Sequence, residues 1–189
     1  PSGPLRVLAV GRLVEKKGFA HLIDALALAR EAGIDFDAQI IGEGELAGEL
    51  AQRIEDSGLS DSCRLLGART QNEVRSLLEN SDVFVAPCVP GADGNIDGLP
   101  TVILESMAVG TPVIATFVSG IPEVVINGRT GVLVPPASAS ALAEALGDVA
   151  SGRVPARDLA RGARVLIEET YDSHVQAARL ASLEGEEER

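Results

Sequence analysis

Two stretches of the chain carry residues whose types and spacing could do chemistry, and the first is the segment 11–18. Arg12 offers a planar fork of N–H donors that suits phosphate oxygens, and Lys17 adds a compact positive charge. Gly11 and Gly18 permit tight turns, and the helix expected to follow points its positive end toward the same place. The segment therefore predicts an anion site, although a solvated loop with ordinary charges would have the same composition.

The second stretch runs from Asp97 to Glu105 and combines two carboxylates with a predicted helix start. Gly98 and Pro100 predict a turn, and a helix that begins at Thr101 leaves its first backbone amides free to bind an anion. Ionised carboxylates only accept hydrogen bonds, so they suit hydroxyl donors such as those of a sugar or a ribose. The alternatives are a turn cap at Asp97 and a solvated helix position at Glu105.

Three further patterns carry less chemistry. The segment 120–123 predicts a short helix near the same place, where Glu123 either caps the helix or contacts a ligand. The segment 42–48 resembles a dinucleotide fingerprint but has one residue too many before its last glycine and follows the second strand, so a turn and helix start is the better interpretation. The segment 93–98 matches the beginning of a calcium loop, but Leu104 stands where that loop requires an acid.

Other reaction classes lack the residues that they need. His21 and His174 are far apart in the sequence, so no metal-ligand spacing exists, and Ser119 has no local His partner or nucleophile elbow. Cys63 and Cys88 are isolated and predict ordinary buried thiols. We therefore expect no metal site, no hydrolase centre and no disulfide framework.

The composition is that of a globular domain with an acidic surface. Its 189 residues are 46% hydrophobic and 23% charged, and the formal net charge is −12. This balance argues against nucleic acid as a partner and against direct contact of the domain with an anionic membrane. Neither a signal peptide nor an apolar run of about 18 residues is found, so a cytoplasmic location is expected.

Apolar runs alternate with helical patterns along the chain. The runs predict strands at residues 5–10, 38–41, 64–66, 83–86, 112–115 and 131–134. The helical patterns lie at residues 19–32, 46–57, 72–80, 101–109, 138–149, about 156–170 and 174–183. This alternation predicts an α/β fold with a parallel sheet, whose ligand binds beyond the carboxyl ends of the strands. The two chemical stretches both follow predicted strands and therefore belong at that edge.

Together these blocks resemble the C-terminal domain of glycosyltransferase family 4, the group 1 retaining enzymes with two facing Rossmann-like domains in a GT-B fold. The resemblance is carried by the segments 11–18, 42–44, 97–114, 120–123 and 128–131, and it covers nearly the whole chain. Its most specific block is 97–114, with an acid, seven further residues and then Glu. The resemblance implies a Rossmann-like, doubly wound parallel sheet of about six strands flanked by helices, plus C-terminal helices.

The same resemblance assigns catalytic roles within a site for a nucleotide-diphosphate sugar. Arg12 and Lys17 would hold the diphosphate and stabilise the charge that grows on it as it leaves. Glu105 would receive the ribose hydroxyls, and Asp97 would contact sugar hydroxyls where the family usually has Glu. Because Asp is one methylene shorter than Glu, this difference is expected to alter the sugar preference or to weaken donor binding.

The remaining donor contacts implied by the resemblance come largely from the backbone. The Thr101 amide and its neighbours would bind the distal phosphate, and the nucleobase would meet the chain around Ala68 and Arg69. The implied donor is UDP- or GDP-linked and needs no metal. The donor-binding positions assigned in this way are Gly11, Ala68, Arg69, Gly98, Leu99, Pro100 and Thr101.

The resemblance also implies how the chain is organised and what it meets. Residues 1–170 would form the nucleotide-sugar-binding domain, and residues 171–189 a crossover and terminal helix that return to an N-terminal domain. Because the chain enters its first strand at Leu5, we expect a part of a longer protein without that domain. The absent domain would bind the acceptor, a glycan or a lipid-linked sugar, and the terminal helix would pack on its own domain or on a second copy in a dimer.

The implied activity is the retaining transfer of a hexosyl group to an acceptor hydroxyl in polysaccharide or glycolipid biosynthesis. The isolated domain is expected to be inactive or nearly so, and the complete enzyme to be peripheral at the inner membrane face. One alternative is a non-catalytic module that binds nucleotide sugars for regulation. Another is half of a sugar-nucleotide epimerase, which the lack of a paired His or acid base disfavours.

Overall fold

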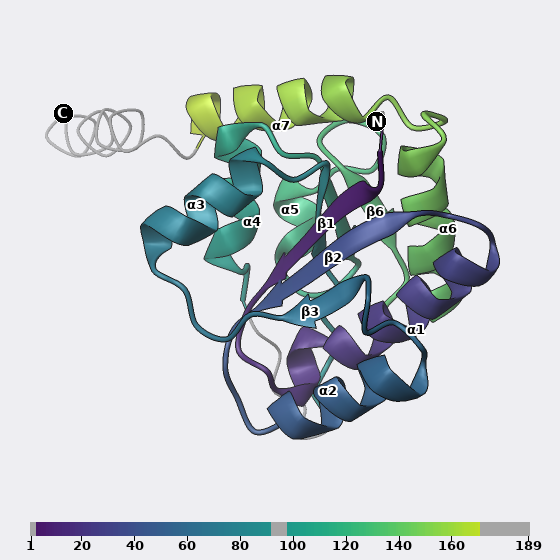
Figure 1. The fold of residues 1–189 in the computed structure, drawn as a ribbon. Helices are drawn as coiled ribbons and strands as arrows, with labels where there is room; N and C mark the ends of the chain where they lie inside the picture. The colour runs from purple at the N-terminus through teal and green to yellow at the C-terminus, as the bar shows by residue number, and fades with distance from the viewer. Residues whose placement is uncertain (1–2, 92–97, 171–189) are drawn as a thin grey trace, which may run out of the picture.

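One parallel sheet of six strands forms the centre of the fold in the computed structural model, which describes residues 3–91 and 98–170 (Figure 1). The strands are β1 (Leu5–Val10), β2 (Phe36–Ile41), β3 (Cys63–Leu65), β4 (Val83–Ala86), β5 (Val113–Thr116) and β6 (Val132–Val134). They lie in the order β3-β2-β1-β4-β5-β6, and every neighbouring pair is parallel. Because the order runs outward from β1 and β4 in both directions, the predicted doubly wound sheet is confirmed.

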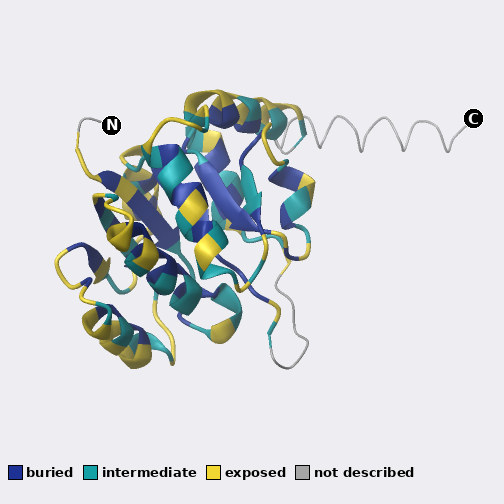
Figure 2. Ribbon diagram, turned by 90° about the vertical axis from the view of Figure 1, so that its right-hand side faces the viewer, coloured by how far each residue is buried: buried dark blue, intermediate teal, exposed yellow. Residues whose placement is uncertain are grey.

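Helices cover both faces of the sheet and close two separate hydrophobic cores. One face carries α1 (Phe19–Glu31), α2 (Ala47–Asp56) and α6 (Ala139–Ala150); the other carries α3 (Gln71–Glu79), α4 (Thr101–Val109), α5 (Ile121–Val124) and α7 (Ala156–Thr170). Val7 and Ala9 of β1 point into the first core, whereas Leu8 points into the second, as the alternation of a strand requires. Figure 2 shows the result, buried strands between helices whose outer surfaces are exposed.

The predicted elements agree with the structure to within one or two residues at most boundaries. β2 begins at Phe36 and not at residue 38, because Phe36 is buried and pairs with Leu5 although Asp37 interrupts the apolar pattern. A short 3-10 helix, η1 (Glu15–Lys17), was not predicted. The predicted helix 174–183 and the whole segment 171–189 lie outside the described residues.

The two cysteines are buried thiols, as predicted. Burial raises the pKa of Cys63 to about 12, because an ionised sulfur would lose its hydration in the core. Its thiolate is therefore scarce at neutral pH, and the residue is a packing element.

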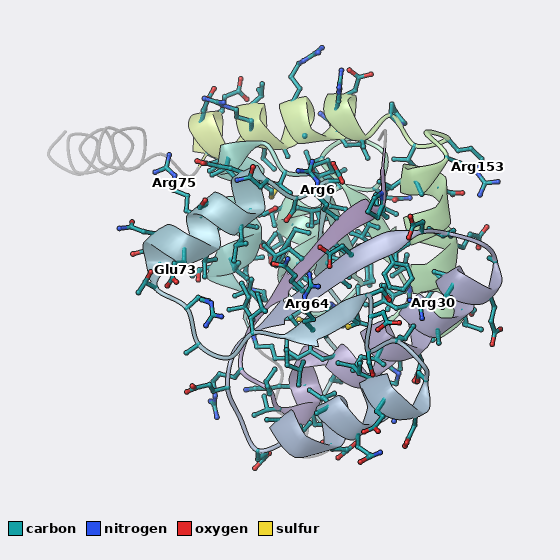
Figure 3. All side chains as sticks on the ribbon, viewed as in Figure 1. Arg6, Arg30, Arg64, Glu73, Arg75 and Arg153 are labelled. Carbon is teal, nitrogen blue, oxygen red and sulfur yellow. The ribbon has the colours of Figure 1, made fainter. Side chains whose placement is uncertain are left out.

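Arg6, which Figure 3 labels, bonds to Asp82 and so joins the amino ends of β1 and β4. The guanidinium donates to both carboxylate oxygens, from Nε to Oδ2 at 3.0 Å and from Nη2 to Oδ1 at 2.8 Å, and the Arg6 backbone N–H donates to Oδ2 at 2.9 Å. These hydrogen bonds from Arg6 lower the pKa of Asp82 below its ordinary value. A lowered folded-state pKa adds stability that is present above the ordinary Asp pKa near 4 and is lost as the pH falls below it.

Asp82→Asn is therefore expected to cost about 1 kcal/mol at pH 7 and less at about pH 3, where the stabilisation by the carboxylate is already partly lost. Urea unfolding of both proteins at the two pH values measures this difference. Glu79→Gln is the control, since Glu79 pairs with Arg75 on the surface of α3 and its loss should change little at either pH. An Asp82→Asn cost that is the same at both pH values would contradict the link to the carboxylate charge.

Candidate functional site

A cleft of about 480 Å³ opens where β1 ends, beside β4, at the point where the strand order reverses. The loop after β1, the first turns of α3 and the segment 98–105 line it. Doubly wound sheets bind their ligands at this position. The two chemical stretches of the sequence are thus brought together on one cleft, as predicted. Its polar side chains are Arg12, Lys16, Lys17, Gln71, Thr101 and Glu105.

One side of the cleft is cationic. The Arg12 side chain is exposed and makes no hydrogen bond or ion pair with any residue in the described ranges. Lys16 and Lys17 are half-buried and line the same cleft. Three cations from one short loop give this cleft a local positive charge within a chain whose net charge is −12. The arrangement suits a multiply charged anion.

The turn after β2 packs against the loop after β1 and holds its backbone in place. Leu13 donates its backbone N–H to the Glu43 carbonyl at 2.9 Å. A Cβ on Gly42 would lie 1.8 Å from the Gly11 carbonyl oxygen, and one on Gly44 would lie 2.4 Å from the Leu13 oxygen. These two glycines therefore serve close backbone packing, which agrees with the interpretation of 42–48 as a turn and helix start. α2 begins just after this turn, at Ala47.

The loop is also fastened to the segment that follows β4. Val89 donates its backbone N–H to the Lys16 carbonyl at 3.0 Å, and Gly18 lies against the Pro87 carbonyl. Thr116 at the end of β5 donates its hydroxyl to the Cys88 carbonyl at 2.5 Å, which holds this segment from the other side. The cations therefore stand on a loop whose backbone is bonded to two strand exits.

The start of α4 forms the opposite wall. Pro100 is the N-cap residue and offers no side-chain cap to the helix. The backbone amides of Thr101 and Val102 donate to no residue in the part of the chain that the structure describes. Free amides at the positive end of a nine-residue helix favour an anion at this point. Leu99 and Gly98 continue the wall beside them.

Glu105 lies one turn into α4 and lines the cleft, as expected. Its side chain is half-buried, and its carboxylate forms no hydrogen bond or ion pair with another described residue. A partly buried carboxylate without a partner loses hydration without compensation, so it favours a ligand that donates hydrogen bonds. Hydroxyl groups supply such donors.

The nucleobase positions inferred from the resemblance do not line the cleft. Ala68 and Arg69 are exposed, and the Arg69 guanidinium donates to the Ala68 carbonyl at 2.8 Å. Gln71 and Val74 of α3 line the cleft instead, and sequence reasoning missed both. The sequence does contain a capping box at Thr70, which marks the start of α3. That start places Gln71 and Val74 near the carboxyl ends of the strands, where the cleft lies.

Three other sequence patterns have different outcomes. Asp97 and most of the calcium-like segment 93–98 lie outside the described residues. Segment 120–123 begins the predicted short helix α5, but Glu123 does not line the cleft. A Cβ on Gly120 would lie 3.7 Å from both the Glu123 Oε1 and the Leu99 Cβ, so this turn supports the cleft wall from outside.

The described residues hold no group of three or more His, Cys, Asp or Glu side chains placed to bind a metal ion. None of the helices within the described ranges is long and apolar enough to cross a membrane.

Comparison with known proteins identifies relatives over nearly the whole chain. The model of the family described as glycosyl transferases group 1 matches residues 1–166. The chain is 36% identical over 180 residues to the amylovoran biosynthesis glycosyltransferase AmsK of Erwinia amylovora, covering 95% of this chain and 44% of that protein. It is 31% identical over 178 residues to the GDP-mannose-dependent alpha-(1-6)-phosphatidylinositol monomannoside mannosyltransferase of Mycolicibacterium smegmatis, covering 94% and 47%. The chain therefore spans less than half the length of these relatives.

Solved structures share the fold. HepE of Anabaena, in complex with UDP, superimposes with a TM-score of 0.84 at 24% identity, over 97% of this chain and 50% of that one. The C-terminal domain of the group 1 family protein LpcC from Francisella tularensis gives a TM-score of 0.78 at 25% identity, over 91% and 89%. Both the family match and the identity to AmsK agree with the blocks noted in the sequence, and the chain belongs to the group 1 glycosyl transferases.

Proposed function

We propose that the chain is the donor-binding part of a retaining glycosyltransferase, which transfers a hexosyl group from a nucleotide diphosphate to an acceptor hydroxyl. The cleft beside β1 and β4 carries this proposal. Arg12, Lys17 and the amides of Thr101 and Val102, which donate to no described residue, match a diphosphate. The Glu105 carboxylate, unpaired among the described residues, matches the hydroxyls of a ribose.

The chemistry follows from where charge develops. When the bond between the sugar and the diphosphate oxygen breaks, negative charge grows on the departing nucleotide. Arg12, Lys17 and the α4 amides face that charge and lower the barrier, and the amides need no reorganisation because the helix fixes them. The acceptor hydroxyl oxygen bonds to the anomeric carbon on the face from which the phosphate leaves, and the departing phosphate takes the hydroxyl proton. This retaining mechanism needs no protein nucleophile.

The donor is proposed to carry uracil or guanine, and the acceptor to be a glycan or a lipid-linked sugar. HepE was solved with UDP, and the mycobacterial relative is named for GDP-mannose, so both bases have support. AmsK is named for the biosynthesis of amylovoran. Because the chain covers less than half of these relatives, we propose that a further domain binds the acceptor, and that this chain binds donor but turns over little. The complete enzyme is proposed to act in the cytoplasm, at the inner membrane face.

Calorimetric titration of the purified chain with UDP, GDP, uridine and guanosine tests this function. At least one diphosphate is expected to bind about tenfold or more tightly than its nucleoside, because the cleft offers charged and amide donors for phosphate. Circular dichroism shows whether the chain is folded under the same conditions. A folded chain that binds neither diphosphate would contradict the proposal.

A further inference from the structure

Phe19, the first residue of α1, lies directly behind the cationic wall of the cleft and is only 3% exposed. The atoms nearest to a hypothetical Cβ on Gly11 show where the Phe19 ring lies. A Cβ on Gly11 would lie 3.4 Å from the Phe19 Cζ, 3.3 Å from the Lys17 Cδ and 3.5 Å from the Lys17 Cε. The tip of the ring and the end of the lysine stem therefore occupy the same side of Gly11.

The Lys17 stem lies in a narrow slot between Gly11 and Phe19, where it has little room to move. Lys17 and Phe19 border one small gap of about 10 Å³, which they share with Cys88 and Pro100. A gap of that size barely admits a water molecule, so on this side the half-buried stem faces apolar atoms and not solvent. Phe19 belongs to the first hydrophobic core, and the close packing of that core keeps its ring beside the stem.

We infer that Phe19 is a positioning residue, which together with the bare Cα of Gly11 holds the stem of Lys17 and directs its ammonium into the cleft. A free lysine side chain has four rotatable carbon bonds, so its charge is spread over many positions. Apolar packing along the stem removes most of these positions before a ligand arrives. The inference rests on the proposed function for the assignment of Lys17 to the diphosphate.

An ordinary core role for Phe19 makes a different prediction from a role through Lys17. Loss of a core ring lowers stability and affects every ligand alike. Loss of Lys17 positioning affects only the phosphate part of a ligand, and only while Lys17 is present. A double-mutant cycle separates the two roles, because coupling to Lys17 is the signature of action through it.

The experiment titrates UDP, GDP and the two nucleosides into the wild-type chain, Phe19→Ala, Lys17→Ala and the double variant. Phe19→Ala is expected to weaken diphosphate binding about tenfold, the scale of one hydrogen bond to a charged group, and to change nucleoside binding less than about twofold. In the Lys17→Ala background the same substitution should cost nothing further. Phe19→Leu, which keeps most of the apolar contact, should restore most of the affinity.

Two matched controls keep the test specific. Phe36→Ala removes a ring of the same core at 4% exposure, where β2 begins at the opposite edge of the sheet, and should lower Tm without changing the ratio of diphosphate to nucleoside affinity. Gly11 does not have a positive φ, so alanine fits its backbone. Gly11→Ala should weaken diphosphate binding as Phe19→Ala does, and again only when Lys17 is present. Gly48→Ala, with nothing within 4 Å of the added methyl, should leave binding unchanged.

The outcomes also distinguish this inference from the proposed function. The positioning role alone is overturned if Phe19→Ala weakens diphosphate binding as much in the Lys17→Ala background as in the wild type, or weakens nucleoside binding equally. It is also overturned if Phe19→Ala leaves diphosphate binding unchanged while Lys17→Ala weakens it. If Lys17→Ala has no effect, or the wild-type chain binds neither diphosphate, the assignment of Lys17 in the proposed function falls, and the positioning role falls with it.

Discussion

Replacing Gly18 with alanine is expected to lower the free energy of unfolding by about 3 kcal/mol and to abolish nucleotide binding. Gly18 has a φ of 69°, in the left-handed region, and a Cβ there would lie 1.9 Å from the Pro87 carbonyl oxygen. That oxygen is backbone and cannot turn aside as a side chain can. The residue ends η1 and precedes α1, so a shift of this loop away from Pro87 moves its neighbour Lys17 as well.

Gly58→Ala is the matched control for this prediction. Gly58 has nearly the same φ, 66°, but no atom lies within 4 Å of an added Cβ. It should cost about 1 kcal/mol, from backbone strain alone, and leave binding intact. Urea unfolding and calorimetry of both variants measure the two effects. Equal costs at the two positions would show that the close approach to Pro87 does not hold the loop.

Arg12→Ala and Lys17→Ala are each expected to weaken binding of UDP or GDP about ten- to a hundredfold. Nucleoside binding should change less than about twofold, because the assigned contacts are to phosphate only. Raising the salt concentration should weaken diphosphate binding in the wild-type chain and have a smaller effect in the variants. Calorimetric titration at two ionic strengths provides both comparisons.

The control is Arg75→Ala, which removes a cation from α3 that pairs with Glu79 at 3.0 Å and does not line the cleft (Figure 3). Its effect on diphosphate binding should be small. If Arg12→Ala weakens uridine binding as much as UDP binding, the Arg12 side chain does not contact the phosphates.

Much of this architecture was predictable because the elements carry strong periodicity. β1 and β4 are short apolar runs, and their bounds were predicted to the residue. The two chemical stretches were predicted to share one edge, because each follows a strand and parallel strands end together. That reasoning needs only the type and order of the elements, which local patterns supply.

The contacts that shape the cleft were not predictable in the same way. Gln71 and Val74 line it because α3 packs beside α4 in the second core, a result of the strand order and not of local pattern. The slot between Gly11 and Phe19 depends on a short 3-10 helix that folds Lys17 back over the glycine. Both features depend on tertiary packing. In the sequence alone, the residues that form them look like any other helix or loop residues.

A crystal structure of the chain with UDP or GDP, whichever binds more tightly, tests the central claim most directly. The distal phosphate is expected within hydrogen-bond distance of the Thr101 and Val102 amides and of Arg12 or Lys17, and the ribose hydroxyls are expected on Glu105. A nucleotide bound in the neighbouring groove between α3 and α4, with its phosphates away from Arg12 and from the start of α4, would contradict it.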